Sequence, residues 1–243
     1  MVVFDDLVAE QDRLDAILGR LDEREWASPS AARGWTIADV VLHLAQTEEA
    51  VAASVAGADL ALRSAGGATL DEVMDRLVRA DRAAPAAVLR RWRAARMAAL
   101  KALRAADPQR LLAWAAEPLK PATLATTRLA EHWAHGLDIA GPLSIAFPDT
   151  ARLRHVAWLA HRSLPYALAR AGEPPHEICC VLTAPDGTTS WRYGPPTAIS
   201  TITGAAGAFC RVATQRLTPA QSGLIATGPH GATALSVLRT YAA

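Results

Sequence analysis

Two stretches that lie far apart in the chain carry side chains able to bind a metal ion. His43 lies in the apolar run VVLHLA, and the run EHWAH places Glu131 and His135 four residues apart. In a helix, two such residues project from one face, with Cβ atoms roughly 6 Å apart, which suits two ligands of one ion. Two imidazoles and one carboxylate leave coordination positions open for water or a substrate, as in catalytic sites. The pattern therefore predicts a metal site formed by His43, Glu131 and His135.

Other interpretations of these residues stay open at the level of sequence. A histidine on an apolar helix face can be a hydrogen-bonded core residue, and Glu131 and His135 can form an ordinary pair four residues apart. His132 competes as a ligand, but it points about 100° away from Glu131 around a helix. Asp138 lies one turn beyond His135 and could accept an imidazole N–H, or it could serve as a solvated or capping residue.

Amphipathic helices are expected to position these residues. Apolar residues recur at steps of three and four between residues 3 and 24, and Thr36 with Asp39 resembles a capping box that begins a helix over 37–57. Strong helix formers fill 86–106, and a further helix is expected over 123–140. Four long helices of this kind predict a four-helix bundle. Thr69 is expected to cap an additional helical stretch between the second and third of them.

The pattern changes after residue 172, where a further helix over 150–171 is expected to end. Short strands are predicted in the segments that follow, at 177–183, 189–193, 198–203 and 224–227, with helices at 204–214 and 232–241. The fold class is therefore α plus α+β. We expect two domains, a helical one over 1–172 that includes the connecting helix, and a small α+β one over 173–243.

Composition limits the classes of function. The chain has 243 residues, 25 basic and 24 acidic, for a net charge of +1, and 51% of its residues are hydrophobic. This balance argues against binding to nucleic acid or to a membrane surface, which usually requires a basic excess. No apolar run approaches the roughly 20 residues that span a bilayer, and the first residues are acidic where a secretory signal is basic. A cytoplasmic protein is expected.

The three cysteines, Cys179, Cys180 and Cys210, are an odd number and include an adjacent pair, which suits a reducing compartment. The adjacent pair lies in an apolar stretch, so we expect buried strand residues rather than nucleophiles. The sequence contains no Gly-x-Ser-x-Gly elbow, Walker loop or dinucleotide-binding glycine motif. These absences argue against the corresponding hydrolase and nucleotide-binding classes.

Two motifs together carry a family resemblance: GWTIADVVLHLA at 34–45 and RLAEHWAHGLDI at 128–139. They resemble the DinB-like metalloenzymes of the mycothiol-dependent maleylpyruvate isomerase and mycothiol S-transferase family. In that family a Trp-Thr pair begins the helix that bears the first metal-binding histidine, and Glu-x-x-x-His on the fourth helix supplies the other two ligands. The resemblance implies His43, Glu131 and His135 as ligands, the same three residues that spacing selects.

The C-terminal part is also similar to that family, in WRYGP at 191–195 and FCRVATQR at 209–216. The resemblance thus spans nearly the whole chain and implies a DinB-like four-helix bundle followed by a sterol-carrier-like α+β domain. Arg216 matches an arginine that reaches toward the active site in the family, where a fixed cation could hold a substrate carboxylate. A surface or interface role is the alternative, and Arg192 is the second choice for the catalytic role.

Two further features bear on the substrate. The segment QTEE at 46–49 is more polar than the aromatic-rich stretch expected in close members of the family, so the identity of the substrate does not carry over. Trp35 and Trp133 could line a pocket, or they could belong to the helical core.

The resemblance implies a divalent metal, with zinc as the default and nickel, manganese or iron allowed by the ligands, and mycothiol as a cosubstrate. A metal-bound thiolate would then be the nucleophile, which fits the absence of cysteine from the predicted bundle. Transfer or exchange of the thiol on a small metabolite, in specialised metabolism for example, is the first expected reaction. Cis–trans isomerisation of an unsaturated acid such as maleylpyruvate is the second.

Two other classes remain as alternatives: a metalloenzyme of the same fold that uses no thiol, and a binding module without catalysis. The expected partners are a small-molecule substrate and a low-molecular-weight thiol, with no nucleic acid and no membrane. Alanine-rich helix surfaces could also pack against a second copy of the chain, so a homo-oligomer stays open.

Overall fold

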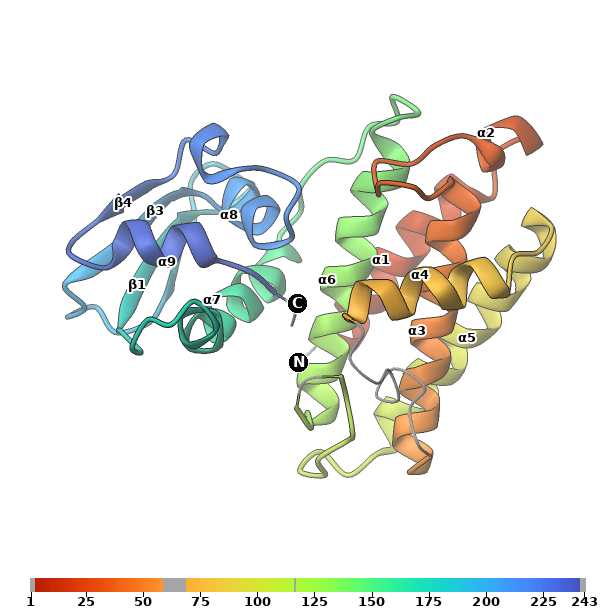
Figure 1. Cartoon of the computed structure of the whole chain (residues 1–243), viewed down its shortest axis with the longest axis horizontal. Coiled ribbons are helices and arrows are strands. Elements are labelled where there is room, and N and C mark those ends of the chain that lie inside the picture. Colours follow the sequence, from red (N-terminus) through yellow and green to blue (C-terminus); the bar gives the residue numbers. More distant parts are fainter. Residues whose placement is uncertain (1–2, 59–68, 116, 241–243) are drawn as a thin grey trace. The chain divides into compact units, whose positions relative to one another are not determined.

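Helices fill the first part of the chain. The computed structural model describes residues 3–58, 69–115 and 117–240. Its first helices are α1 (Val3–Leu18), α2 (Glu23–Ala27), α3 (Ile37–Ala56), α4 (Leu70–Ala80), α5 (Pro85–Ala105) and α6 (Pro121–Ala140). Helices α1, α3, α5 and α6 pack against one another as a four-helix bundle, and α4 packs on α3 (Figure 1). The predicted bundle is confirmed.

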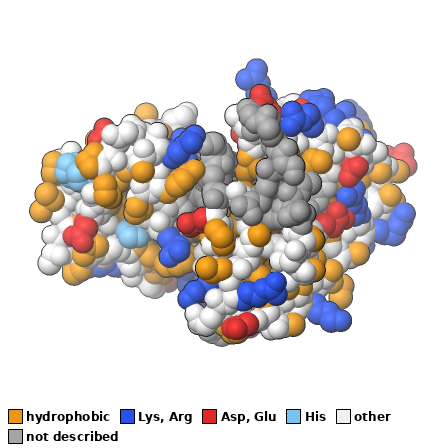
Figure 2. Space-filling view, turned by 60° about the horizontal axis from the view of Figure 1, so that its bottom comes forward, with side chains coloured by type: hydrophobic (Ala, Val, Ile, Leu, Met, Phe, Trp, Pro, Cys, Tyr) orange, Lys and Arg blue, Asp and Glu red, His pale blue; other side chains and the backbone are white. Residues whose placement is uncertain are grey.

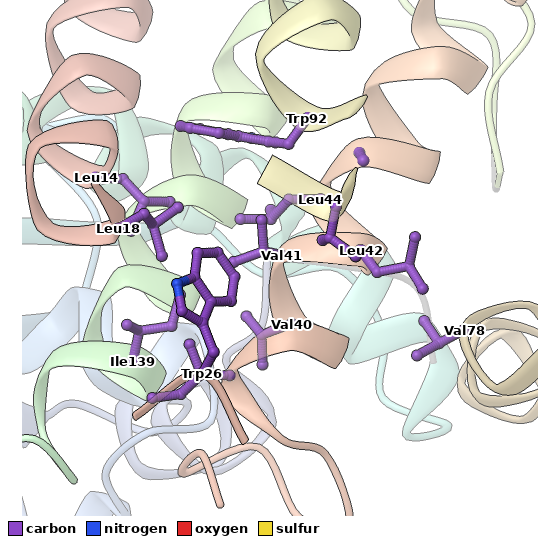
Figure 3. Close-up of a cluster of buried hydrophobic side chains, with 13 residues drawn as sticks. Leu14, Leu18, Trp26, Val40, Val41, Leu42, Leu44, Val78, Trp92 and Ile139 are labelled. Carbon is purple, nitrogen blue, oxygen red and sulfur yellow. The ribbon is translucent and has the colours of Figure 1, made fainter. Parts of the chain in front are cut away.

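A continuous apolar core holds the bundle together. Side chains from α1, α2, α3, α5 and α6 meet in it, and Figure 3 shows the indole of Trp26 between the leucines of α1 and Ile139 of α6. Trp92 of α5 lies in the same core and is fully buried. Burial of apolar surface at about 25 cal/mol per Å² is the main force that aligns these helices.

Helix α3 begins where the capping pattern predicts. The Thr36 side chain accepts a hydrogen bond from the backbone N–H of Asp39 (3.2 Å), and Asp39 accepts one from the N–H of Thr36 (3.0 Å). The helix ends at Gly57, whose φ of 79° lies in the left-handed region that glycine adopts without strain. His43 therefore lies in the interior of a helix with a fixed start and a fixed end.

The first predicted helix, over 3–24, is divided in two. Helix α1 ends at Leu18, and Asp22 begins α2 through a capping box with Glu25 (2.8 Å in each direction). The capping box satisfies backbone N–H groups that a continuous helix would pair internally, so the chain restarts there. Helix α6 starts at Pro121, two residues before the predicted start, because proline is favourable at the first helical position.

The second part of the chain combines helices with a small sheet. Its elements are α7 (Leu153–Arg170), β1 (Ile178–Thr183), β2 (Ser190–Tyr193), β3 (Ser200–Ala205), α8 (Ala206–Ala213), a 3-10 turn (Pro219–Gln221), β4 (Ile225–Thr227) and α9 (Gly231–Val237). The strand order is β2-β1-β3-β4, with β1 and β3 parallel and the two outer pairs antiparallel. The four predicted strands are all present, and the α plus α+β fold class is confirmed. The predicted last helix over 232–241 corresponds to α9, and Tyr241 lies outside the described residues.

The chain divides into two compact units, one up to Phe147 and one from Pro148 onward. The predicted boundary was residue 172, after the connecting helix. Helix α7 instead packs against α8 and α9, and the thiol of Cys210 in α8 lies 3.7 Å from the backbone oxygen of Leu153. The apolar face of α7 is thus buried by the elements that follow it, which the sequence of α7 alone does not reveal.

The surface agrees with the composition. On the face that Figure 2 displays, basic and acidic side chains are interspersed, as expected of a chain with a net charge of +1. Within the described residues, no helix combines the length and the apolar character that crossing a bilayer requires.

Replacing Thr36 by alanine tests the helix start that positions His43. The change removes a side-chain acceptor at the N-cap of α3, so we expect the free energy of unfolding to fall by about 1 kcal/mol. Thr36→Ser keeps the acceptor and is expected to remain within a few tenths of a kcal/mol of the original chain. Urea denaturation followed by circular dichroism measures both. An alanine variant as stable as the original would contradict the capping role.

Candidate metal centre

Helices α3 and α6 bring the three predicted ligands together. The Nε2 atoms of His43 and His135 each lie 3.5 Å from Oε2 of Glu131, and one ligand atom from each residue lies within 4.8 Å of the others. Two ligands of a tetrahedral zinc ion, each 2.0–2.1 Å from the metal, are roughly 3.3 Å apart. The two nitrogen–oxygen separations of 3.5 Å are therefore close to the separation of two ligands on one zinc ion.

The orientation of His135 also suits a ligand. Its Nδ1–H donates a hydrogen bond to Oδ2 of Asp138 (2.9 Å), so the lone pair of the neutral ring lies on Nε2, which faces Glu131. Metal-binding histidines are commonly oriented by a carboxylate in this way. Asp138 is 2% exposed, so the structure selects the acceptor role among the roles predicted for it.

Burial and local charges set the protonation states of the triad. Burial lowers the pKa of His43 to about 4, which leaves a neutral imidazole near pH 7. Burial alone would raise the pKa of Glu131, but hydrogen bonds with His135 and His43 hold it well below its usual range. Burial alone would lower the pKa of His135, yet Asp138 and Glu131 raise it. A cation entering the site would replace the proton that this arrangement favours on His135.

The triad is accessible to solvent mainly through its carboxylate. The Glu131 side chain is 29% exposed, against 9% for His43 and 11% for His135. The ring of Trp35 lies 5.1 Å from that of His43 and 6.5 Å from that of His135, and its Nε1 donates to Oδ1 of Asp75 in α4 (3.0 Å). Trp35 therefore borders the triad, as one of its two predicted roles requires. Trp133 is 2% exposed and belongs to the interior of the bundle.

Comparison with known proteins identifies the family of this chain. Residues 7–140 match the family model described as the mycothiol maleylpyruvate isomerase N-terminal domain, a segment that includes all three candidate ligands. The chain belongs to this family. It is 36% identical over 242 residues to uncharacterized proteins from two strains of Mycobacterium tuberculosis, covering 98% of this chain and 94% of each relative. The resemblance inferred from the two motifs is confirmed.

Solved structures support the fold. The crystal structure of a mycothiol-dependent maleylpyruvate isomerase superposes with a TM-score of 0.63 at 15% identity, covering 93% of this chain and 91% of that one. A histidine-to-alanine variant of that isomerase gives the same TM-score at 14% identity. At such low identity the likeness shows only that the fold of the isomerase extends over both units, and it gives no information about the substrate of this chain.

The remaining site candidates lie elsewhere. His132 has both ring nitrogens engaged, since Nδ1–H donates to the backbone oxygen of Arg128 (2.8 Å) and Nε2 accepts from Nε1 of Trp92 (3.1 Å), so it does not join the triad. In the second unit, Arg216 donates to the backbone oxygen of Thr214 and borders a surface pocket of about 320 Å³. Arg192 is exposed on β2.

All three cysteines are buried, as the sequence predicted for Cys179 and Cys180. Cys179 and Cys180 lie in β1 and are 4% and 0% exposed, and Cys210 is 0% exposed in α8. Burial raises the pKa of Cys180 to about 12 and that of Cys210 well above its ordinary value. Neither of these two thiols is poised to act as a nucleophile near pH 7.

Three polar residues next to the triad are absent from the predicted set: Thr47, Glu48 and Arg128. They are 5%, 0% and 2% exposed, and the guanidinium of Arg128 in α6 donates hydrogen bonds to Thr47 and Glu48 in α3. The signal in the sequence is a charged residue on a helix stripe that is otherwise buried. Arg128 follows Leu124 and precedes His132 at four-residue steps on that stripe.

Asp138→Ala tests the orientation of His135. The change removes the acceptor for Nδ1–H and frees the ring to rotate, so we expect the affinity for zinc to fall about 10- to 100-fold. A competition titration with a chromophoric chelator gives the dissociation constant. Asp81→Ala, on the exposed surface of the same bundle, is the control and should bind zinc as the original chain does. Equal affinities for all three proteins would contradict the role of Asp138.

Proposed function

We propose that this protein is a metal-dependent enzyme that uses mycothiol as a cosubstrate and transfers or exchanges the thiol on a small metabolite. The observation that carries the proposal is the convergence of His43, Glu131 and His135 within 4.8 Å, with the carboxylate partly open to solvent. Three protein ligands leave at least one coordination position for a visiting sulfur. Membership in the mycothiol maleylpyruvate isomerase family supports the choice of thiol.

The donor set suits a divalent cation of the zinc type. It combines two imidazoles with one carboxylate, both rings have little access to solvent, and Asp138 orients the ring of His135 as a ligand. A bound cation, with zinc as the default, would supply a positive charge that lowers the pKa of a coordinated thiol and so provides a thiolate nucleophile near pH 7.

The chain's own residues would hold and shield the reactants. Asp138 keeps His135 oriented, and Glu131 contributes the negative charge of the ligand set. Trp35 provides an aromatic wall beside both imidazoles. Arg216 is the proposed catalytic residue of the second unit, where its guanidinium would hold a substrate carboxylate.

Two reactions start from the same attack of sulfur on an electrophilic carbon. In transfer, a C–S bond forms while the bond to a leaving group breaks, and the thiol stays on the product. In isomerisation, sulfur adds to a C=C bond, the resulting single bond rotates, and elimination of the thiol restores the double bond. Isomerisation of an unsaturated acid is the second candidate, and the description of the matching family model favours it.

We also propose a cytoplasmic location, in which the enzyme and its small reduced thiol would share a compartment. Three free, buried cysteines are compatible with reducing conditions. Oligomeric assembly remains a hypothesis to be tested by sedimentation.

Thermal unfolding with and without mycothiol tests the proposal. For the zinc-loaded protein, we expect saturating mycothiol to raise the Tm by several degrees, because a ligand that binds only the folded state stabilises it. Glu131→Ala is expected to lose the zinc and the shift together. Mass spectrometry of reactions with maleylpyruvate and with alkylating electrophiles then separates a product that retains the thiol from one that regains the mass of the substrate.

Three outcomes would overturn parts of the proposal. A zinc-loaded protein that mycothiol does not stabilise would favour a metalloenzyme without a thiol cosubstrate. Unchanged metal content in a His43→Ala variant would contradict the proposed metal centre and favour a binding module without catalysis. A thiol-dependent change of double-bond geometry without a thiol adduct would replace transfer by isomerisation.

A further inference from the structure

A buried ion pair joins α3 to α6 about one helical turn from the metal-site residues. Nε of Arg128 donates to Oε1 of Glu48 (2.9 Å), and its NH2 group donates to the hydroxyl of Thr47 (2.7 Å). Thr47 lies four residues after His43 in α3, and Arg128 lies three residues before Glu131 in α6. These bonds therefore connect the two helices at the level where the ligands must meet.

The same cluster reaches a third helix. The backbone oxygen of Arg128 accepts a hydrogen bond from Nδ1–H of His132, and Nε2 of His132 accepts one from the indole N–H of Trp92 in α5. His132 and Trp92 are both 0% exposed. We call the residues Thr47, Glu48, Trp92, Arg128 and His132 the buried polar cluster.

The buried polar cluster is not expected to stabilise the fold more than apolar side chains of the same size would. Removing two charges from water costs several kcal/mol for each ion, and an apolar pair of similar volume is commonly as stable or more so. The second carboxylate oxygen of Glu48 is buried and has no hydrogen-bond partner within the described residues. A leucine or methionine pair would fill the space without these costs, so the cluster is better explained by the directions of its bonds.

We propose that Arg128 is a positioning residue of the metal centre: by bonding both Glu48 and Thr47, it fixes the separation between His43 on α3 and the ligand pair Glu131 and His135 on α6. An apolar contact can slide with little change in free energy, whereas the fork of a guanidinium holds two acceptors in fixed directions. The ligands are thereby held ready for the ion before it binds. This inference rests on the proposed metal-dependent function.

The test compares two double variants of the full-length chain. Glu48→Met with Arg128→Met replaces the buried ion pair by an apolar pair without leaving a lone charge. Glu49→Met with Arg91→Met is the matched control. It removes a partly exposed ion pair between α3 and α5, in which Nε of Arg91 lies 2.7 Å from Oε1 of Glu49. Both residues are sequence neighbours of members of the buried polar cluster. Zinc affinity is measured by chelator competition, stability by thermal unfolding of the metal-free proteins, and site geometry by the visible spectrum of the cobalt-loaded forms.

We expect the Glu48/Arg128 variant to fold with a metal-free Tm equal to or above that of the original chain, while its zinc affinity falls about 10- to 100-fold and its cobalt spectrum changes. This range is typical for the loss of groups that orient ligands. The control variant should keep the original affinity and spectrum. Loss of affinity without loss of stability separates positioning from a merely structural role.

A folded Glu48/Arg128 variant with the original affinity and spectrum would overturn the inference. If that variant does not fold, zinc binding by Arg128→Lys tests the inference instead, because a lysine keeps the charge but lacks the planar fork that holds two acceptors. Zinc binding weakened at least several-fold in Arg128→Lys would support the inference, and unchanged binding would overturn it. If the original chain itself binds no metal, the proposed function fails and this inference with it, whereas tight binding by the original and the double variant overturns this inference alone.

Discussion

The structure depends on bringing three candidate ligand atoms from two helices to within 4.8 Å of one another inside a bundle whose core is mostly apolar. Polar groups buried without partners cost free energy, so each ligand has to be satisfied by its neighbours or by an ion. Asp138 does this for one nitrogen of His135, and the carboxylate of Glu131 faces both imidazoles. Nδ1 of His43 is buried and has no partner within the described residues.

The candidate ligands could be selected from the sequence because helical periodicity is local. Four-residue spacing places Glu131 and His135 on one face, and the capping pattern of Thr36 fixes the helix that bears His43. Both signals lie within a few residues, so they need no knowledge of the tertiary structure. The apolar neighbours of His43 indicated that it faces the interior of the predicted bundle, as Glu131 and His135 would, and the resemblance to a family selected the same three residues.

What the sequence could not provide depends on contacts between distant residues. In the sequence Arg128 resembles a solvated helix residue, because its partner Glu48 lies eighty positions away in the chain. The boundary between the two units depends on which elements bury the apolar face of α7, and these elements, α8 and α9, follow it in the sequence. The end of α1 at Leu18 was missed for another reason: the capping box at Asp22 is as local as that at Thr36, but the apolar period continues across it.

The central claim is that His43, Glu131 and His135 hold one cation with a position open to a thiol, and zinc-edge X-ray absorption on the zinc-loaded protein tests it most directly. The account predicts a first shell of nitrogen and oxygen neighbours, with two imidazoles, in the absence of thiol. On addition of mycothiol, it predicts one sulfur neighbour at about 2.3 Å from the metal. A shell without imidazoles, or a shell that mycothiol leaves unchanged, would contradict the account.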